Sequence, residues 1–271
     1  MQLRACLEHV ERLEGDVEWE LIVIDNGSTD GTGQLLQEYA NGSSFPFVVV
    51  EEPKRGLGNA RNSGIKAAKG QILAFTDDDC YPAPDFLVQV TRVFEDEHVG
   101  YMGGRVLLYD PADAPITIML SMDCRLIPPH SFVPPGVING ANMAVRRAVI
   151  DAVGMFDPML GAGSVFASGE DCEYVARASA EGWTGGYFPE PFVYHHHGRR
   201  HQAEVDSLRR NYDKGRGAFY AKFLLRSDTR GLYARNWWWS IDLRQRPGSF
   251  AREVGSAVYY LLLRLIGRLH S

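Results

Sequence analysis

The sequence predicts an α/β fold: a mostly parallel central sheet flanked by helices, followed by a basic helical extension at the carboxyl end. Apolar, strand-like runs at residues 20–25, 47–51 and 71–76 alternate with helical segments at intervals of about 20 residues, as in parallel sheets built from crossover units. Two of these runs end in carboxylates. Beyond residue 198 the net charge changes sign.

The first elements follow from periodicity and turn chemistry. Leu3, Leu7 and Val10 recur at helical spacing, so a helix is expected near the start. The run 20–25 (ELIVID) then leads into residues 26–32 (NGSTDGT), which are rich in turn-forming and helix-capping residues. Strand, turn and helix is the predicted order, and residues 47–51 (FVVVE) form the next strand.

The strand at 71–76 (QILAFT) carries the clearest chemical signal, because three carboxylates follow it: Asp77, Asp78 and Asp79. The carboxyl ends of such strands border ligand-binding crevices, and adjacent like charges repel unless a cation offsets them. Alternation along an extended chain would let Asp77 and Asp79 converge on one hard cation. A solvated acidic turn is the alternative.

Four strings in order carry a family resemblance: IDNGSTDGT at 24–32, GNARNSGIKAAKG at 58–70, FTDDD at 75–79 and GED at 169–171. Over about residues 20–195 the chain resembles a family 2 glycosyltransferase of the GT-A fold. The resemblance implies an inverting transferase that binds Mg²⁺ or Mn²⁺ and a nucleotide-sugar donor, UDP-, GDP- or dTDP-linked. The QxxRW string of processive synthases is missing, which favours a single addition to a glycan or lipid-linked acceptor.

The resemblance also assigns roles to residues. It implies that Asp171 is the general base, that Glu170 orients it or meets the acceptor, and that Asp77 and Asp79 bind the metal, with His195 or His197 as a further ligand. The residues that it places near the donor are Asp25, Asn26, Ser28, Arg61, Asp77, Asp78 and Asn142. Helix capping by the GED string and a polar surface patch for the histidines remain open alternatives.

The charge distribution divides the chain into a domain at 1–198 and an extension at 199–271. The extension holds 15 Lys and Arg against 6 Asp and Glu, a net charge of +9, whereas residues 1–198 carry −15. The extension also contains Trp237, Trp238 and Trp239, and an apolar tail from Ala257 onward that Arg264 and Arg268 interrupt. This composition predicts an interfacial helix on an anionic membrane surface. Packing of the tryptophans and tail on the catalytic domain or on a second subunit is the alternative.

Four cysteines without a CxxC pair indicate reduced thiols, so a cytoplasmic enzyme, peripheral on the inner membrane face, is expected. The acidic catalytic part argues against nucleic acid as a partner.

A catalytically inactive nucleotide-sugar-binding protein is the first rival function. A nucleotidyltransferase is the second, although its glycine-rich signature is not found.

One feature of the family pattern is not found. Family members ordinarily begin with an apolar strand inside the sheet, and nothing strand-like stands before the helix of Leu3, Leu7 and Val10. Its absence would leave unpaired backbone on the neighbouring strands. We expect an upstream extension in the natural product, and a 271-residue form that is poorly stable or weakly active.

Overall fold

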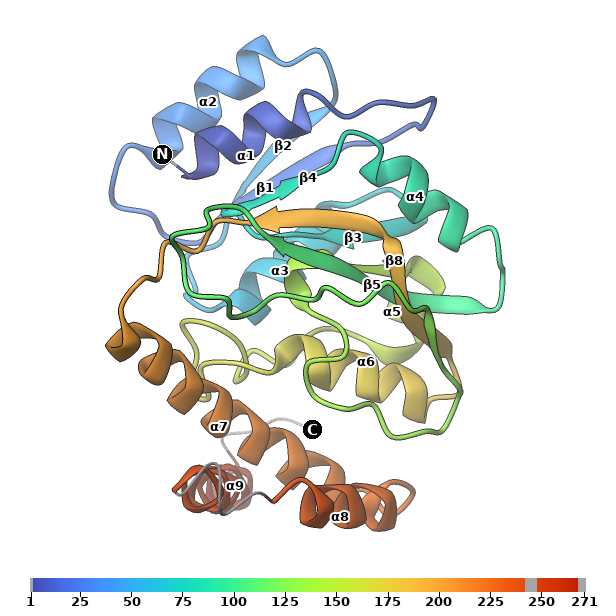
Figure 1. Cartoon of the computed structure of the whole chain (residues 1–271), viewed down its shortest axis with the longest axis vertical. Helices are drawn as coiled ribbons and strands as arrows, with labels where there is room; N and C mark the ends of the chain where they lie inside the picture. The colour runs from blue at the N-terminus through green and yellow to red at the C-terminus, as the bar shows by residue number, and fades with distance from the viewer. Residues whose placement is uncertain (1, 242–247, 268–271) are drawn as a thin grey trace.

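The computed structural model describes residues 2–241 and 248–267 and confirms the α/β class (Figure 1). Its main sheet has the order β3-β7-β5-β8-β4, and β6 pairs with β8. The strands are β3 (Ile72–Phe75), β4 (Cys80–Pro82), β5 (Val99–Leu108), β6 (Arg125–Ile127), β7 (Met143–Arg146) and β8 (Thr184–His195). Because β7 lies antiparallel between β3 and β5, those two strands share a direction, and β8 runs parallel to β5.

A second, two-stranded sheet holds β1 (Leu21–Asp25) and β2 (Phe47–Glu51), which pair in parallel. The positions of β1, β2 and β3 match the three apolar runs that the sequence predicts. The helices α1 (Gln2–Val10) and α2 (Thr32–Gly42) lie above these strands, and α3 (Leu57–Ala67) connects β2 to β3 (Figure 1).

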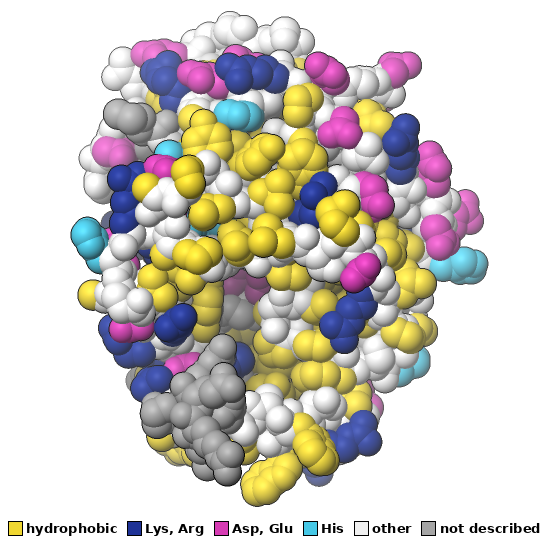
Figure 2. All heavy atoms as spheres, viewed as in Figure 1, with side chains coloured by type: hydrophobic (Ala, Val, Ile, Leu, Met, Phe, Trp, Pro, Cys, Tyr) yellow, Lys and Arg dark blue, Asp and Glu magenta, His cyan; other side chains and the backbone are white. Residues whose placement is uncertain are grey.

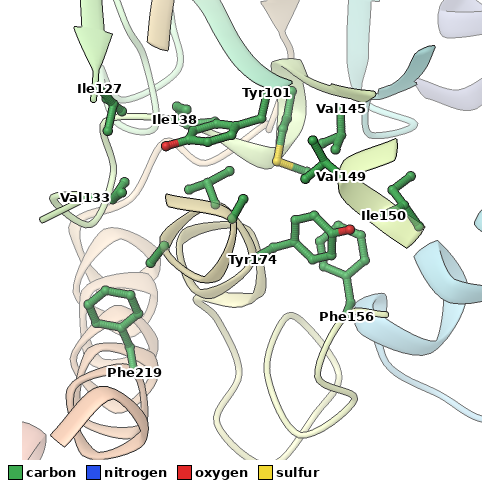
Figure 3. Close-up of a cluster of buried hydrophobic side chains, with 14 of the residues drawn as sticks. Tyr101, Ile127, Val133, Ile138, Val145, Val149, Ile150, Phe156, Tyr174 and Phe219 are labelled. Carbon is green, nitrogen blue, oxygen red and sulfur yellow. The ribbon is translucent and has the colours of Figure 1, made fainter. Parts of the chain in front are cut away.

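Three helices pack on the main sheet: α4 (Phe86–Val93), α5 (Arg147–Val153) and α6 (Glu170–Ala180). They are followed by α7 (Gln202–Leu225), which packs on α6, and by α8 (Arg230–Trp239) and α9 (Ser249–Leu265), which pack on α7. Tyr174 of α6 packs with Phe156 and with side chains of the sheet such as Val145, and Phe219 of α7 belongs to the same buried cluster (Figure 3). The helical extension therefore packs on the rest of the fold instead of standing apart from it.

A buried ion network fixes α7 against α6. The Glu173 carboxylate is fully buried and lies 2.5 Å from Arg177 and 2.9 Å from Lys222, which also pairs with Asp157 at 2.6 Å. Burial raises the pKa of Glu173, but the two cations outweigh that effect and hold it below its usual range. Removing one member would leave a buried charge without a partner, which is strongly destabilising.

The segment at 110–137 forms little regular structure. It holds the short strand β6 and no helix, and Met119 makes an isolated bridge to Val106. Met122 and Leu126 are mostly exposed. No described helix is both long and apolar enough to span a bilayer.

We predict that α7 and α9 tolerate no side chain at Gly217. A Cβ there would overlap the backbone carbonyl of Glu253, so Gly217→Ala should cost about 1–3 kcal/mol of unfolding free energy, measured by urea denaturation. Gly231→Ala in α8 is the matched control, because a Cβ there meets open space and removes backbone entropy from the unfolded chain. Equal stability of the Gly217 variant and the parent would contradict this close helix contact.

Candidate functional site

A cavity of about 1590 Å³ opens where the carboxyl ends of β1 and β3 meet the start of α6 and one side of α7. This is the position at which open α/β sheets bind ligands. Ten of the residues predicted to form the site line it: Asp25, Asn26, Ser28, Arg61, Asp77, Asp78, Asp79, Glu170, Asp171 and His195. Segments far apart in sequence therefore converge on one volume.

One group in the cavity has donors suited to a divalent cation. Asp79, Cys80 and His195 each offer a ligand atom within 4.8 Å of the others, and the Asp79 Oδ2 atom lies 3.4 Å from the His195 Nε2 atom. Burial raises the pKa of Asp79, but the hydrogen bond and charge of His195 outweigh it, so Asp79 stays ionised. Burial raises the pKa of the Cys80 thiol far above its usual value. Carboxylate and imidazole therefore fit Mg²⁺ or Mn²⁺, and the thiol does not.

The Arg61 guanidinium occupies the middle of the site. It is buried, and it lies 2.7 Å from the Glu170 carboxylate and 3.6 Å from that of Asp77. Burial raises the pKa of Glu170 to about 7, with the charge of Asp171 adding to the shift and Arg61 opposing it. Arg61 was expected near the donor, and it lines the cavity, where its two ion pairs also join the end of β3 to α6.

The Asp171 carboxylate is held by the backbone. Its Oδ2 atom accepts a hydrogen bond from the Gly140 N–H at 2.8 Å, and its Oδ1 atom accepts one from the Cys172 N–H at 2.6 Å. Gly169, with a left-handed φ of 91°, turns the chain into α6 just before it. Each carboxylate oxygen has a further lone pair, so Asp171 keeps the capacity to accept a proton while its orientation is fixed.

The turn after β1 is held together by its own side chains. Asp25 accepts a hydrogen bond from the Ser28 N–H at 2.9 Å. The Asn26 amide donates to the carbonyls of Glu52 and Lys54 and accepts from the Gly56 N–H at 2.9 Å. Asn26 thus ties this turn to the loop before α3, and it lines the cavity together with Asp25 and Ser28.

Two predicted site residues do not reach the cavity. Asn142, expected to touch the donor sugar, is fully buried, and its amide donates to the carbonyls of Arg105 and Pro191. His197, one of two histidines expected to share a face, has its Nε2 atom 3.0 Å from the Ala114 carbonyl, while its Nδ1 atom accepts from the Arg199 N–H. Both imidazole rings have partners, since the His195 Nδ1 atom lies 3.0 Å from the Thr117 hydroxyl oxygen, but of these two histidines only His195 lines the cavity, with its Nε2 atom facing Asp79. His195 is therefore the candidate ligand.

Among the lining residues that the sequence did not single out are Arg199, which follows β8, and Tyr212 of α7. Among the described residues the Arg199 guanidinium forms no ion pair, yet its charge helps to lower the pKa of Asp79. Burial, reinforced by the charge of Asp171, raises the pKa of Tyr212, so its hydroxyl stays protonated. In the sequence, Arg199 stands in the polar run that follows a strand-like segment, and this position is the signal that could have identified it as a site residue.

Carboxylates, an imidazole and a buried arginine therefore gather at the carboxyl edge of an α/β sheet, where such sheets bind ligands. Residues 2–154 match the family described as glycosyl transferase family 2. The chain belongs to this family and is a glycosyltransferase.

Individual relatives agree with this assignment. The glycosyltransferase AglE of Haloferax volcanii is 26% identical over 236 residues, which cover 87% of this chain and 74% of AglE. The putative glycosyltransferase EpsH of Bacillus subtilis is 37% identical over 95 residues, 35% of this chain, and that match spans only 27% of EpsH.

Solved structures share the fold. The mannosyltransferase PcManGT of Pyrobaculum calidifontis, in complex with GDP-Man and Mn²⁺, matches with a TM-score of 0.67 and 17% identity, over 94% of this chain and 70% of that one. S. aureus TarS 1–349 in complex with UDP-GlcNAc matches with a TM-score of 0.64 and 15% identity, over 94% and 75% of the two chains.

Proposed function

We propose that this glycosyltransferase is metal-dependent, inverting and non-processive, and that it moves a sugar from a nucleotide-sugar donor to a glycan or lipid-linked acceptor. One observation carries the proposal: the Asp79–His195 group, the Arg61–Glu170 pair and the Asp171 carboxylate all line one cavity. The GDP-Man and Mn²⁺ of one structural neighbour and the UDP-GlcNAc of another support a nucleotide-sugar donor and a divalent ion.

In the proposed reaction an acceptor hydroxyl attacks the anomeric carbon of the donor. Asp171 takes the hydroxyl proton as the new bond forms, and the nucleoside diphosphate leaves with the electrons of the broken C–O bond. The attack comes from the face opposite the leaving group, so the configuration inverts. Asp79 and His195, with Asp77 beside them, would hold a Mg²⁺ or Mn²⁺ that supplies Lewis-acid stabilisation of the leaving group.

Arg199 is our candidate for a protein cation that meets the diphosphate. Arg61 is already engaged by Glu170 and Asp77, whereas Arg199 lines the cavity without an ion pair among the described residues. An arginine near developing negative charge in a partly water-excluded site stabilises the transition state. Asp25 and Ser28, at the end of β1, would face the nucleoside.

The basic test of the activity is a screen of UDP-, GDP- and dTDP-sugars with Mn²⁺, by thermal shift and donor hydrolysis.

With the donor found in that screen, we predict that Asp171→Asn lowers turnover by about two to four orders of magnitude, the usual range for loss of a general base. Donor affinity should change little, because the amide side chain of this variant keeps one acceptor oxygen for the backbone. If donor binding and thermal stability fell together with turnover, Asp171 would be a structural cap of α6.

For the diphosphate we predict that Arg199→Gln weakens catalytic efficiency by roughly 10- to 100-fold, the range expected for one hydrogen bond to a charged group. Arg210→Gln, an exposed position on α7, is the matched control and should leave kcat/KM unchanged. The effect should be seen with the nucleoside diphosphate as inhibitor but not with the nucleoside alone. Equal kinetics for both variants would remove Arg199 from the mechanism.

We further propose that the surface of α8 and α9 binds an anionic membrane. Trp237 is stacked on Tyr220, but Trp238 and Trp239 are 74% and 79% exposed, and Leu265 is 82% exposed. Apolar side chains at the lower end of the molecule lie beside Lys and Arg (Figure 2). Arg264 belongs to α9, whereas Arg268 lies outside the described residues. Exposed tryptophan with arginine is typical of interfacial binding.

Deleting the tail would not test this, because Ala257, Tyr260 and Leu263 are buried against α7. We predict instead that Trp238→Ser combined with Trp239→Ser reduces cosedimentation with phosphatidylglycerol vesicles at least tenfold, without lowering thermal stability. Val49→Ser, an exposed position on β2, is the control. Unchanged vesicle binding in the double variant would show that this surface has another role.

A further inference from the structure

The His195 ring has a protein partner at each of its two nitrogen atoms. The Nε2 atom lies 3.4 Å from the Asp79 Oδ2 atom, and the Nδ1 atom lies 3.0 Å from the hydroxyl oxygen of Thr117. His195 is only 7% exposed, so these protein groups, and not bulk water, determine its hydrogen bonds. The two contacts together decide which ring nitrogen keeps a proton, and therefore which one is free to bind a cation.

The Thr117 hydroxyl has a single proton, and a backbone carbonyl takes it. The Oγ1 atom donates to the Ile116 carbonyl at 2.6 Å. A hydroxyl group can donate only one hydrogen bond, whereas its oxygen has two lone pairs with which to accept. In the contact with His195, therefore, the Nδ1–H group of the ring donates and the Thr117 oxygen accepts.

This direction decides the chemistry of the Nε2 atom. When the imidazole is neutral and its proton is on the Nδ1 atom, the Nε2 atom presents a lone pair. That lone pair faces the Asp79 carboxylate, which is also an acceptor, so the two atoms repel each other unless a cation or a proton lies between them. A metal-ligating histidine characteristically donates its other ring N–H to a fixed acceptor. The Thr117 oxygen is placed as such an acceptor.

The backbone holds Thr117 in a conformation that is unfavourable for this residue type. Its φ of 57° lies in the left-handed region, where a β-branched side chain is an outlier. Such strain persists only where neighbouring contacts fix the chain, and it is concentrated at functional sites. Here Met119 exchanges two backbone hydrogen bonds with Val106 of β5, and the Ala114 N–H donates to the Arg199 carbonyl at 2.8 Å. The segment that carries Thr117 is thus fixed both to β5 and to the residues that follow β8.

We propose that Thr117 is a positioning residue for His195: its hydroxyl oxygen keeps the ring proton on the Nδ1 atom and leaves the Nε2 atom to the metal site beside Asp79. This inference rests on the metal role of His195 in the proposed function. Without the Thr117 hydroxyl, the neutral ring would carry its proton on the Nε2 atom, where the Asp79 carboxylate accepts it. Because metal ligands must be deprotonated, that proton would compete with a divalent cation.

The tautomer can be read in the protein without metal or donor. Two-bond ¹H–¹⁵N correlation spectra of the chain labelled at histidine distinguish a protonated from an unprotonated ring nitrogen, and the signals of His195 are those lost in His195→Gln. We expect a protonated Nδ1 atom in the parent at a pH where the ring is neutral. In Thr117→Val, which keeps the shape and β-branching of threonine but not its hydroxyl, the proton should move to the Nε2 atom. Thr117→Ser should restore the parent tautomer.

Mn²⁺ affinity, measured by electron paramagnetic resonance of the free ion, is the second readout. We expect Thr117→Val to bind Mn²⁺ about 10- to 100-fold more weakly, the usual effect of removing the partner of a ligating histidine. Thr117→Ser should bind as the parent does. The matched control is Thr184→Val, at the opposite end of β8 from His195, which should also leave Mn²⁺ affinity unchanged.

Three results would overturn the role of Thr117. They are a neutral parent ring with its proton on the Nε2 atom, an unchanged tautomer in Thr117→Val, and equal losses of Mn²⁺ affinity in Thr117→Val and Thr117→Ser. If the parent binds Mn²⁺ no more tightly than His195→Gln, the metal role in the proposed function fails, and the role of Thr117 fails with it. The spectra of the metal-free protein distinguish that failure from a wrong hydrogen-bond direction at Thr117.

Discussion

The buried Arg61 guanidinium is the contact on which the geometry of the site depends. It joins α3, which carries it, to Glu170 at the start of α6 and to Asp77 at the end of β3. A guanidinium without partners would be too costly to bury, so its presence requires both carboxylates to stay in place. Asp171, the adjacent residue on α6, is thereby held beside Gly140, and the acidic end of β3 is held toward His195. The Arg61 side chain therefore fixes the position of the proposed base, Asp171, relative to the proposed metal site at Asp79 and His195.

The sequence predicted the strand-end carboxylates well, because their positions depend on local alternation and on the rule that parallel strands end at one edge. Asp25, Asp77 and Asp79 all line the cavity for that reason. It could not predict that Arg61 would pair with Glu170, which lies 109 residues further along the chain.

Two expected site residues do not line the cavity, for local reasons. His195 and His197 share a face as alternation predicts, with ring centroids 5.2 Å apart, but β8 ends at His195 and the His197 ring lies against the Ala114 carbonyl. Asn142 ends a short 3-10 turn that directs its amide into the sheet, a direction that no local pattern reveals. The extension was also predicted only in part. Its basic charge and tryptophans predicted a surface-binding helix, whereas α7 and α9 bury Phe219 and Tyr260 in hydrophobic clusters of the molecule. One side of α9 packs on α7, and the other side presents apolar side chains to solvent.

The assignment of His195, and not His197, as a ligand beside Asp79 is the central chemical claim. Pulsed electron paramagnetic resonance of the Mn²⁺-loaded protein tests it directly, because a coordinated imidazole nitrogen modulates the manganese signal. We expect a nitrogen coupling that changes when histidine is labelled with ¹⁵N, that disappears in His195→Gln and that persists in His197→Gln. A coupling that survives in His195→Gln, or that is lost only in His197→Gln, would contradict the assignment.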